Sequence, residues 1–490
     1  MASRPTDIEA PAQSPRKTEL IALASIILAL CVWSAANDLT LLALMAGILW
    51  LALLPLASWA SLVFFAVMLG LSAVVNQTPI ELGFAKLYGT DLLAVLLTWG
   101  VVLRLWGGKR VDRFPRSARR NERILLLLAG VYVSYGCFSL AVGLSIKGYE
   151  YGEAFGDFRR FFFYALAFAV PILMPMRERH LRALAYALTM GGGCVLLLGY
   201  FRILTDSPVR EDVDSVTQHV GARMLQPDET TTLCLLLVYL LLILRSSGNT
   251  VTKLAALAGA LVTFPPLLLS GYRLSIVLAV TTPFLGYLVL TWARRQPLRR
   301  FLASTLLLAA AVGLPLAAAP FVFPEQVERA QLDLMVRGQS EAAQGGWRIW
   351  TWGGAIEEWK ANPIFGTAMG HRLVFPFRTS DGAFVYIDSG AHNYFIEVLY
   401  QSGLVGLILL LSFHGCFVWY ALTRIRRMAS RYCIIAVALF TGYISIMAGA
   451  FLQSPGVSRY VYLYLLMGFL VCLLRYTEAP ETGAGQTPEP

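Results

Sequence analysis

The sequence contains few charged residues. Asp, Glu, Lys and Arg make up 14% of its 490 positions, while hydrophobic residues make up 57%. A soluble globular domain carries about 25% charged residues, so this composition excludes an ordinary soluble protein. Apolar runs of about 20 residues, the length that an α-helix needs to cross a bilayer, recur along the chain. Short segments of alternating hydrophobicity, typical of a transmembrane barrel, are not evident. The sequence therefore predicts an all-α polytopic membrane protein.

Cysteine and histidine are also scarce, with seven and five residues. The cysteines are scattered in or beside apolar runs without a Cys-x-x-Cys pair, which argues against a disulfide framework or a cysteine-ligated metal. We expect them to be small buried hydrophobic residues. The histidines show neither His-x-x-x-His nor His-Glu-x-x-His spacing, so a zinc site has little support. We expect the protein to need no metal and no cofactor.

Acidic residues are outnumbered by basic ones, which gives a formal net charge of +10. Such a surplus can indicate nucleic-acid binding. Here, however, the Lys and Arg residues are concentrated in short loops between apolar runs, where they set the orientation of a membrane protein. They can also contact anionic lipid headgroups. We therefore expect the lipid bilayer as a partner and no nucleic acid.

Hydropathy predicts about 12 to 14 transmembrane helices. The candidate spans are 20–36, 39–56, 60–75, 91–105, 124–146, 161–176, 181–204, 230–244, 254–270, 274–293, 301–319, 394–422, 433–451 and 460–474. They divide the chain into five parts: a disordered tail (1–19), a transmembrane bundle of about 11 spans (20–319), a large polar loop with amphipathic helices (320–391), C-terminal transmembrane helices (392–475) and a second disordered tail (476–490).

Basic clusters predict the orientation of these spans. The clusters at 104–123, 177–182, 245–253, 294–300 and 424–431 all fall on the same side of the membrane as the N-terminus. The excess of Lys and Arg marks that side as cytoplasmic, so both termini are expected there. The loops at 76–90, 147–160, 205–229 and 320–391 then face outward. In a bacterial inner membrane these loops would be periplasmic.

Arginines on the expected outer face break the charge pattern. They are Arg223 before the span at 230, Arg273 in a tight turn between two spans, and Arg348 in the large loop. A guanidinium offers fixed, always-charged donors that suit a phosphate or diphosphate. The alternative is an interfacial side chain or a structural ion pair, for which Asp228 and Glu229 are nearby partners. For Arg273, which is forced into a short apolar-flanked turn, we favour a functional role.

His392 closes the large loop and is the second candidate. A neutral imidazole, with a pKa near 6.5, can accept a proton from a hydroxyl group. The alternative is a structural histidine that bonds a loop carbonyl or caps the helix starting at Asn393. In the same loop, residues 347–359 read as an amphipathic, Trp-rich helix. Such a helix can lie at the bilayer surface or pack against the bundle.

Four segments carry a resemblance to a known family. They are Asp157-Phe158-Arg159-Arg160 before an aromatic-rich span, Ser270-Gly271-Tyr272-Arg273, Arg348-Ile349-Trp350 with Asn362-Pro363-Ile364-Phe365-Gly366, and His392-Asn393 followed after nine residues by Gly403-Leu404-Val405-Gly406. In this order and spacing they resemble the O-antigen ligase and polysaccharide polymerase superfamily of bacterial inner membranes. The resemblance covers the C-terminal half well and the N-terminal half only by topology. One departure is the Gly-Tyr pair inserted between Ser270 and Arg273.

The resemblance implies a glycosyltransferase that uses no nucleotide sugar. Its donor would be a glycan on undecaprenyl diphosphate, and its acceptor a hydroxyl of lipid A-core or of a glycan chain. His392 would be the general base. Arg273 and Arg348 would bind the donor diphosphate, with Arg223 and Arg160 as further candidates. Attack at the anomeric carbon would invert it without a metal.

Other functions stay open at this point. The His-Asn spacing to Gly403 favours a ligase over a polymerase, although the large loop fits both. A transporter, such as a lipid-linked oligosaccharide flippase, has a similar number of spans. Carriers tend to place charges mid-membrane between repeats, whereas here the polar residues gather in one outer loop. A purely structural membrane protein is disfavoured by the outer arginines.

Overall fold

The structure is a computed structural model of the full chain. The residues it describes are 80–81, 86–87, 91, 116–173, 178–205, 210–213, 220–223, 225–270, 273–295, 349–378, 384–388, 390–428, 430–452 and 457–476. The predicted spans at 20–75 and 301–319, and all but the first residue of the span at 91–105, lie outside these residues.

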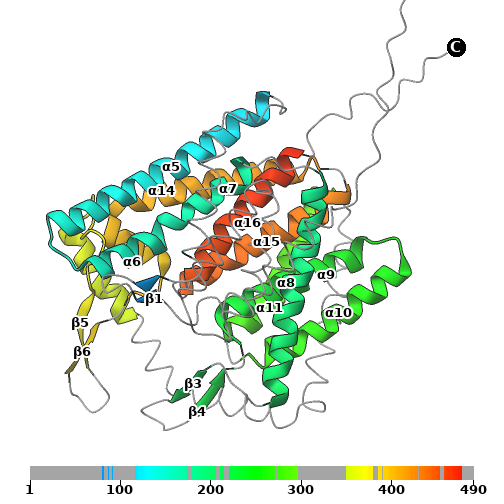
Figure 1. The fold of residues 1–490 in the computed structure, drawn as a ribbon, viewed down its shortest axis with the longest axis horizontal. Coiled ribbons are helices and arrows are strands. Elements are labelled where there is room, and N and C mark those ends of the chain that lie inside the picture. The colour runs from blue at the N-terminus through cyan, green and yellow to red at the C-terminus, as the bar shows by residue number, and fades with distance from the viewer. Residues whose placement is uncertain are drawn as a thin grey trace, which may run out of the picture.

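The described part is built mainly from helices, which confirms the predicted all-α class (Figure 1). The N-terminal group comprises α5 (Arg116–Ser145), α6 (Tyr151–Phe161), the 3₁₀ turn η2 (Phe163–Ala165), α7 (Leu166–Leu173) and α8 (Glu178–Thr205). There follow α9 (Pro227–Ser246), α10 (Thr250–Leu268), α11 (Arg273–Ala293) and a loop helix over residues 349–361. The C-terminal group is α14 (Tyr394–Ile425), α15 (Ser430–Leu452) and α16 (Val457–Tyr476).

Six of the described helices are long and apolar enough to cross a membrane. These segments are Arg120–Ser145, Arg182–Thr205, Asp228–Ser246, Thr250–Leu268, Tyr394–Ile425 and Tyr432–Phe451. Each coincides with a predicted span to within a few residues. The expected spans at 274–293 and 460–474 are helical as α11 and α16, but they are not among these six, and Val277–Ala293 counts only as a shorter apolar helix. A further expected span, at 161–176, does not form a single helix, because α6 ends at Phe161 and the chain turns through η2 before α7.

The helices pack in two groups joined by α15. Helix α9 lies among α8, α10, α11 and α15, while α5 packs on α14 and α7 packs on α16 (Figure 1). Buried aromatic rings hold the second group together; Tyr394, for example, stacks near Phe161 and Tyr460. The outer helices expose large apolar side chains, such as Leu127 (65% exposed) on α5. Such a surface fits contact with lipid rather than with water.

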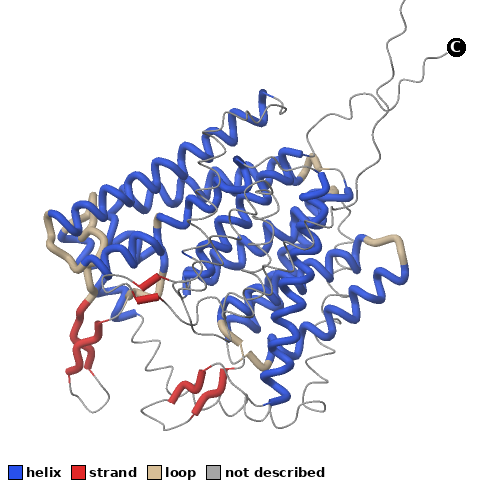
Figure 2. The backbone as a smooth tube through the Cα atoms, viewed as in Figure 1, coloured by secondary structure: helices blue, strands red, loops and turns tan. Residues whose placement is uncertain are grey.

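Three two-stranded antiparallel hairpins accompany the helices (Figure 2). They pair β1 (Ile80–Glu81) with β2 (Lys86–Leu87), β3 (Arg210–Val213) with β4 (Val220–Arg223), and β5 (Val374–Arg378) with β6 (Phe384–Asp388). The sequence analysis did not predict them. All three fall within segments expected on the outer face, and the last two lie along the lower edge of the molecule in Figure 2.

The cysteine prediction holds for half of the six cysteines that the structure describes. Cys234, Cys433 and Cys472 are buried. The other three, Cys137, Cys194 and Cys416, are exposed on their helices. Since an apolar side chain on a helix in lipid does not need burial inside the protein, hydrophobicity alone did not separate the two sets.

Helix α14 is broken at Gly403, and a turn from the large loop fills the break. Gly403 has φ 65° and ψ −168°, outside the helical region. The amides of Leu404 and Val405 donate to the carbonyls of Pro363 (2.9 Å) and Ile364 (3.2 Å). On the other side of the break, Thr367 N and Ala368 N donate to the carbonyls of residues 400 and 401, at 2.9 Å each. The turn at residues 363–368 and the α14 segment at residues 400–406 therefore bind each other through their backbones, and these two segments together are called the clasp below.

Glycine is required at Gly403 because of this clasp. A Cβ at this position would lie 2.2 Å from Ile364 O, and its positive φ disfavours other residues. We expect Gly403→Ala to lower the free energy of unfolding by about 2–4 kcal/mol, measured by thermal unfolding in detergent. Gly415→Ala on the same helix is the control, because a Cβ there meets nothing within 4 Å. Equal melting temperatures for the two variants would contradict this account of the break.

Candidate functional site

His392 stands where the large loop enters α14, and its backbone is held on both sides. Just before it, the carbonyl of Ala391 accepts a hydrogen bond from Trp352 Nε1 of the loop helix (2.8 Å). Just after it, Asn393 caps α14, its Oδ1 accepting from Phe395 N (3.0 Å) and Ile396 N (3.2 Å). The capping side chain is therefore Asn393. His392 itself has φ 51°, a left-handed conformation that is uncommon for a residue other than glycine.

Glu397, one turn into α14, binds the backbone of His392. Its Oε1 accepts the His392 amide proton at 3.1 Å. The Glu397 side chain is 1% exposed, and its Oε2 lies 3.5 Å from Arg160 of α6. A buried carboxylate is costly unless a cation and hydrogen bonds compensate it. Arg160 supplies that charge from a different helix.

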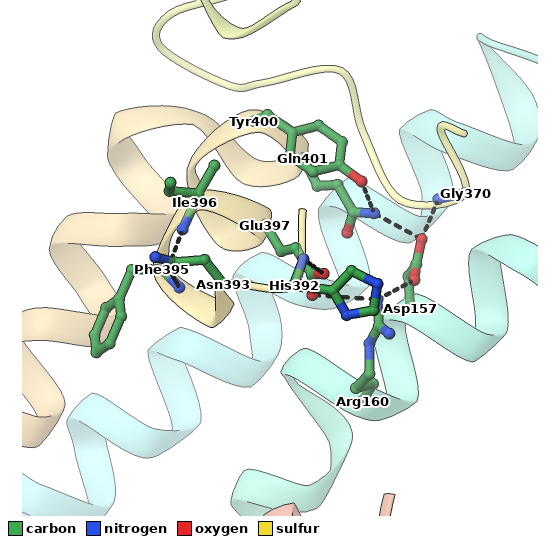
Figure 3. A network of polar contacts seen from close by, with 10 residues as sticks. All are labelled: Asp157, Arg160, Gly370, His392, Asn393, Phe395, Ile396, Glu397, Tyr400 and Gln401. Carbon is green, nitrogen blue, oxygen red and sulfur yellow. Dashed lines mark hydrogen bonds and ion pairs between the residues drawn. The ribbon is translucent and has the colours of Figure 1, made fainter. Parts of the chain in front are cut away.

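Arg160 also pairs with Asp157 of its own helix, at 3.1 Å (Figure 3). Asp157 Oδ2 in turn accepts from Gln401 Nε2 (2.8 Å) and from Gly370 N (3.3 Å). Gln401 lies four residues after Glu397, on the same face of α14. The network therefore ties α6, Gly370 of the large loop and the start of α14 together beside His392.

The neighbouring Arg159 binds a different carboxylate. Its guanidinium binds Asp91 Oδ2 at 2.6 Å, with both side chains buried. Tyr164 also donates to Asp91. Successive helical residues point about 100° apart. Arg159 and Arg160 therefore bind different carboxylates: Asp91 in one case, Asp157 and Glu397 in the other.

The electrostatics of the network favour a charged arginine and a carboxyl that protonates easily. Burial opposes the charged form of Arg160, but Glu397 and Asp157 outweigh that effect and raise its pKa, so it stays a cation. Burial is also the main cause that raises the pKa of Asp157 to about 6; Arg160 lowers it and Glu397 raises it. With both carboxyls ionised, the trio carries one net negative charge.

We expect Asp157 to make stability depend on pH. Its pKa of about 6, above the usual 3.8, means that the fold favours the protonated form. Ionisation therefore costs the folded state nothing below pH 3.8 and the full penalty above pH 6. Between pH 4 and 7 the wild type should lose about 1–3 kcal/mol relative to Asp157→Asn, measured as melting temperature against pH. Parallel curves for the two proteins would contradict this. Glu153→Gln, a more exposed carboxyl on the same helix, controls for the loss of a charge.

The other predicted arginines lie at ends of elements or outside the described residues. Arg273 is the first residue of α11. Arg223 ends β4, shortly before α9 begins at Pro227. Arg348 lies outside the described residues. Among the predicted site residues, the structure brings His392 and Arg160 together through Glu397.

The acidic residues that were offered as partners for Arg223 have other partners. Glu229 pairs with Arg202 at 2.7 Å, and Asp228 pairs with Arg459 at 2.6 Å.

The predicted loop helix is present over residues 349–361, and it packs inward. Trp352 and Trp359 lie against the buried cluster formed by Ala355, Leu373, Ala391 and Tyr400. Trp359 Nε1 also donates to Pro363 O at 3.0 Å. In contrast, Ile349 and Trp350 are 68% and 59% exposed at the start of the helix. The inner face of this helix therefore supports the His392 segment.

One comparison, with family models, found a match. Residues 258–411 match the model described as O-antigen ligase. This segment, called the ligase domain below, is therefore similar to O-antigen ligases. The match confirms the resemblance to the O-antigen ligase and polysaccharide polymerase superfamily, and with it a glycan-transferring function of the ligase or polymerase kind. A search of curated proteins found no match to the chain.

The ligase domain contains only part of the network. Arg273, Arg348, His392, Glu397 and Gln401 lie inside residues 258–411. Asp157, Arg160 and Arg223 precede the domain, yet the first two contact it directly. Among the described residues, no three His, Cys, Asp or Glu side chains are grouped so that they could hold a metal ion.

The sequence analysis missed Glu397 and Gln401 of the ligase domain. Both residues lie within the predicted span at 394–422, and the sequence-based prediction gave their polar side chains no role. Their spacing of four residues predicts that the two side chains lie on one helix face, and Glu397 binds the His392 amide. A carboxylate inside a predicted membrane helix is itself a signal of function, so the signal was present.

Proposed function

We propose that the protein is a periplasm-facing, metal-independent, inverting glycosyltransferase of the bacterial inner membrane. It moves a glycan from undecaprenyl diphosphate to an acceptor hydroxyl. The observation that carries the proposal is the position of His392 inside the ligase domain: a left-handed residue at the start of α14, bonded through its amide to the buried Glu397. Strained backbone of this kind is typical of functional sites.

In this reaction His392 is the general base. Its neutral imidazole accepts the proton of the acceptor hydroxyl as that oxygen attacks the anomeric carbon of the donor sugar. The new glycosidic C–O bond forms while the C–O bond to the diphosphate breaks. The electron pair leaves with undecaprenyl diphosphate, and the anomeric centre inverts. The proton on His392 then passes to solvent, which returns the base to its neutral form.

The arginines supply the positive charge that the leaving diphosphate needs. Arg273 and Arg348 are proposed to bind the diphosphate, with Arg223 as a third candidate. Their guanidinium groups would stabilise the charge that grows on the leaving oxygen. Arg160 is the weakest of the four candidates for this role, because two carboxylates already surround it.

The acceptor separates two closely related activities. A ligase transfers the glycan to lipid A-core, and a polymerase transfers it to another glycan chain. The purified protein should be given undecaprenyl-diphosphate glycan and each acceptor in turn, with a metal chelator and without nucleotide sugar. We expect one acceptor to yield a product, and we expect NMR to show that its anomeric configuration is inverted relative to that of the donor. Retention of configuration, or a strict need for nucleotide sugar, would rule the proposal out.

A further inference from the structure

The carboxylate of Glu397 is buried beside His392, in the first turn of α14, where the helix dipole favours a negative charge. Glu397 is 1% exposed. Its Oε2 lies near Arg160 and has no hydrogen-bond partner among the described residues. An apolar side chain of similar size would fill this position at less cost in desolvation. What the carboxylate does here follows from its contacts with His392 and Arg160.

The contact that Glu397 makes with His392 fixes a backbone that would otherwise relax. His392 has φ 51°, and its amide donates to Glu397 Oε1 at 3.1 Å. The bonds at Ala391 and Asn393 hold the flanking residues, but Glu397 binds the backbone of the histidine itself. A left-handed residue persists only where its surroundings over-determine it. Glu397 is one of the groups that do so here.

The local sequence leaves room for this carboxylate. A Cβ at Gly390 would lie 2.6 Å from Glu397 Oε1, closer than real Cβ atoms approach. Glycine at 390 therefore leaves space for the Glu397 carboxylate to reach the end of the loop. The absence of a side chain at Gly390 thus permits the hydrogen bond between Glu397 and the His392 amide.

Arg160 holds Glu397 in place from α6. The guanidinium lies between Glu397 (3.5 Å) and Asp157 (3.1 Å) (Figure 3). Asp157 is itself held by Gln401 and by Gly370 N of the large loop. A movement of α6 or of the clasp would therefore move Glu397, and with it the backbone of His392.

We propose that Glu397, held by Arg160, is a positioning residue for glycan transfer: it fixes His392 so that its imidazole meets the acceptor hydroxyl. The inference rests on the proposed function, in which His392 is the general base. It also gives Arg160 a role other than binding the donor diphosphate. A displacement of about 1 Å in a catalytic group can cost 100-fold in rate, which sets the size of the expected effect.

The test is a double-mutant cycle on the purified protein with Glu397→Gln, Arg160→Met and the double variant. If Arg160 acts by holding Glu397, each change lowers kcat about 10- to 100-fold. The double variant is then no slower than the slower single one. The KM values for donor and acceptor stay within about threefold. If Arg160 binds the diphosphate instead, Arg160→Met raises the KM for the donor. The rate losses of Glu397→Gln and Arg160→Met then multiply in the double variant, and this result would overturn the inference.

A second cycle separates positioning from general damage to the fold. In a His392→Ala background, Glu397→Gln should leave the residual rate unchanged, because the group that it positions is gone. A further drop would show that Glu397 acts on the fold rather than through His392. Glu153→Gln on α6, whose exposed ion pair with Arg372 lies apart from the network, is the matched control and should keep kcat within twofold.

The same variants distinguish failure of the inference from failure of the proposed function. If His392→Ala loses transfer while Glu397→Gln keeps full activity, only the positioning role is wrong. If His392→Ala keeps full activity, the general-base assignment is wrong, and the positioning role falls with it.

Discussion

Replacing His392 with alanine is expected to lower kcat for glycan transfer by about 100- to 10 000-fold, the usual contribution of a general base. The physical reason is that the variant lacks the proposed general base, which takes the proton of the acceptor hydroxyl as its oxygen attacks. Binding of the donor should change little, because the proposed diphosphate ligands are arginines at other positions. The measurement is steady-state transfer by the purified variant, with KM for donor and acceptor determined separately.

Two controls keep this result interpretable. The melting temperature of His392→Ala should stay close to that of the wild type, since the main bonds at Ala391 and Asn393 do not use the imidazole. Added imidazole should restore part of the lost rate, because it can occupy the vacated space and accept the proton. An unchanged kcat in the variant would remove His392 from the chemistry.

The second large effect is on stability, at the buried pair of Glu122 and Arg475. Each side chain is 6% exposed, and the guanidinium binds the carboxylate with both Nε (2.8 Å) and Nη2. Tyr420 also donates to Glu122, and Arg475 donates to the carbonyl of Ile172. The cluster thus joins α5, α7, α14 and α16. Removing one partner leaves an uncompensated buried charge, so Glu122→Ala should cost about 3–5 kcal/mol of unfolding free energy.

Two further variants test whether the charge is the cause. Replacing both partners with apolar residues, as in Glu122→Leu with Arg475→Met, should recover most of the loss, because neither charge is then left alone. Glu357→Ala removes an exposed ion pair with Lys360 and should cost less than about 1 kcal/mol. A Glu122→Ala variant as stable as Glu357→Ala in thermal unfolding would contradict the account.

The membrane class and most described helices could be predicted from the sequence, because apolar runs and their lengths are local properties. The prediction of one continuous span at 161–176 was wrong, because hydropathy reports composition and not the path of the backbone. The composition of this segment is apolar throughout, but hydropathy does not register the turn at residues 163–165 that divides it. The hairpin β5–β6 was missed although Asp381-Gly382, a common turn pair, stands between two runs rich in Val, Phe and Tyr.

Contacts between distant segments could not be predicted. The Pro363 turn and the Gly403 break were both identified as motifs, but nothing local indicates that their backbones bond to each other. The same holds for Arg160 and Glu397, which lie more than 200 residues apart. The histidine, in contrast, could be identified from its place at the end of the loop.

The most direct test of the central claim uses proteoliposomes that hold undecaprenyl-diphosphate glycan and face a membrane-impermeant acceptor. The account predicts that the wild type forms glycosylated acceptor and free undecaprenyl diphosphate in equal amounts, and that His392→Ala forms neither above background. If the wild type moves the donor across the bilayer without joining it to the acceptor, the protein is a carrier and the account is wrong.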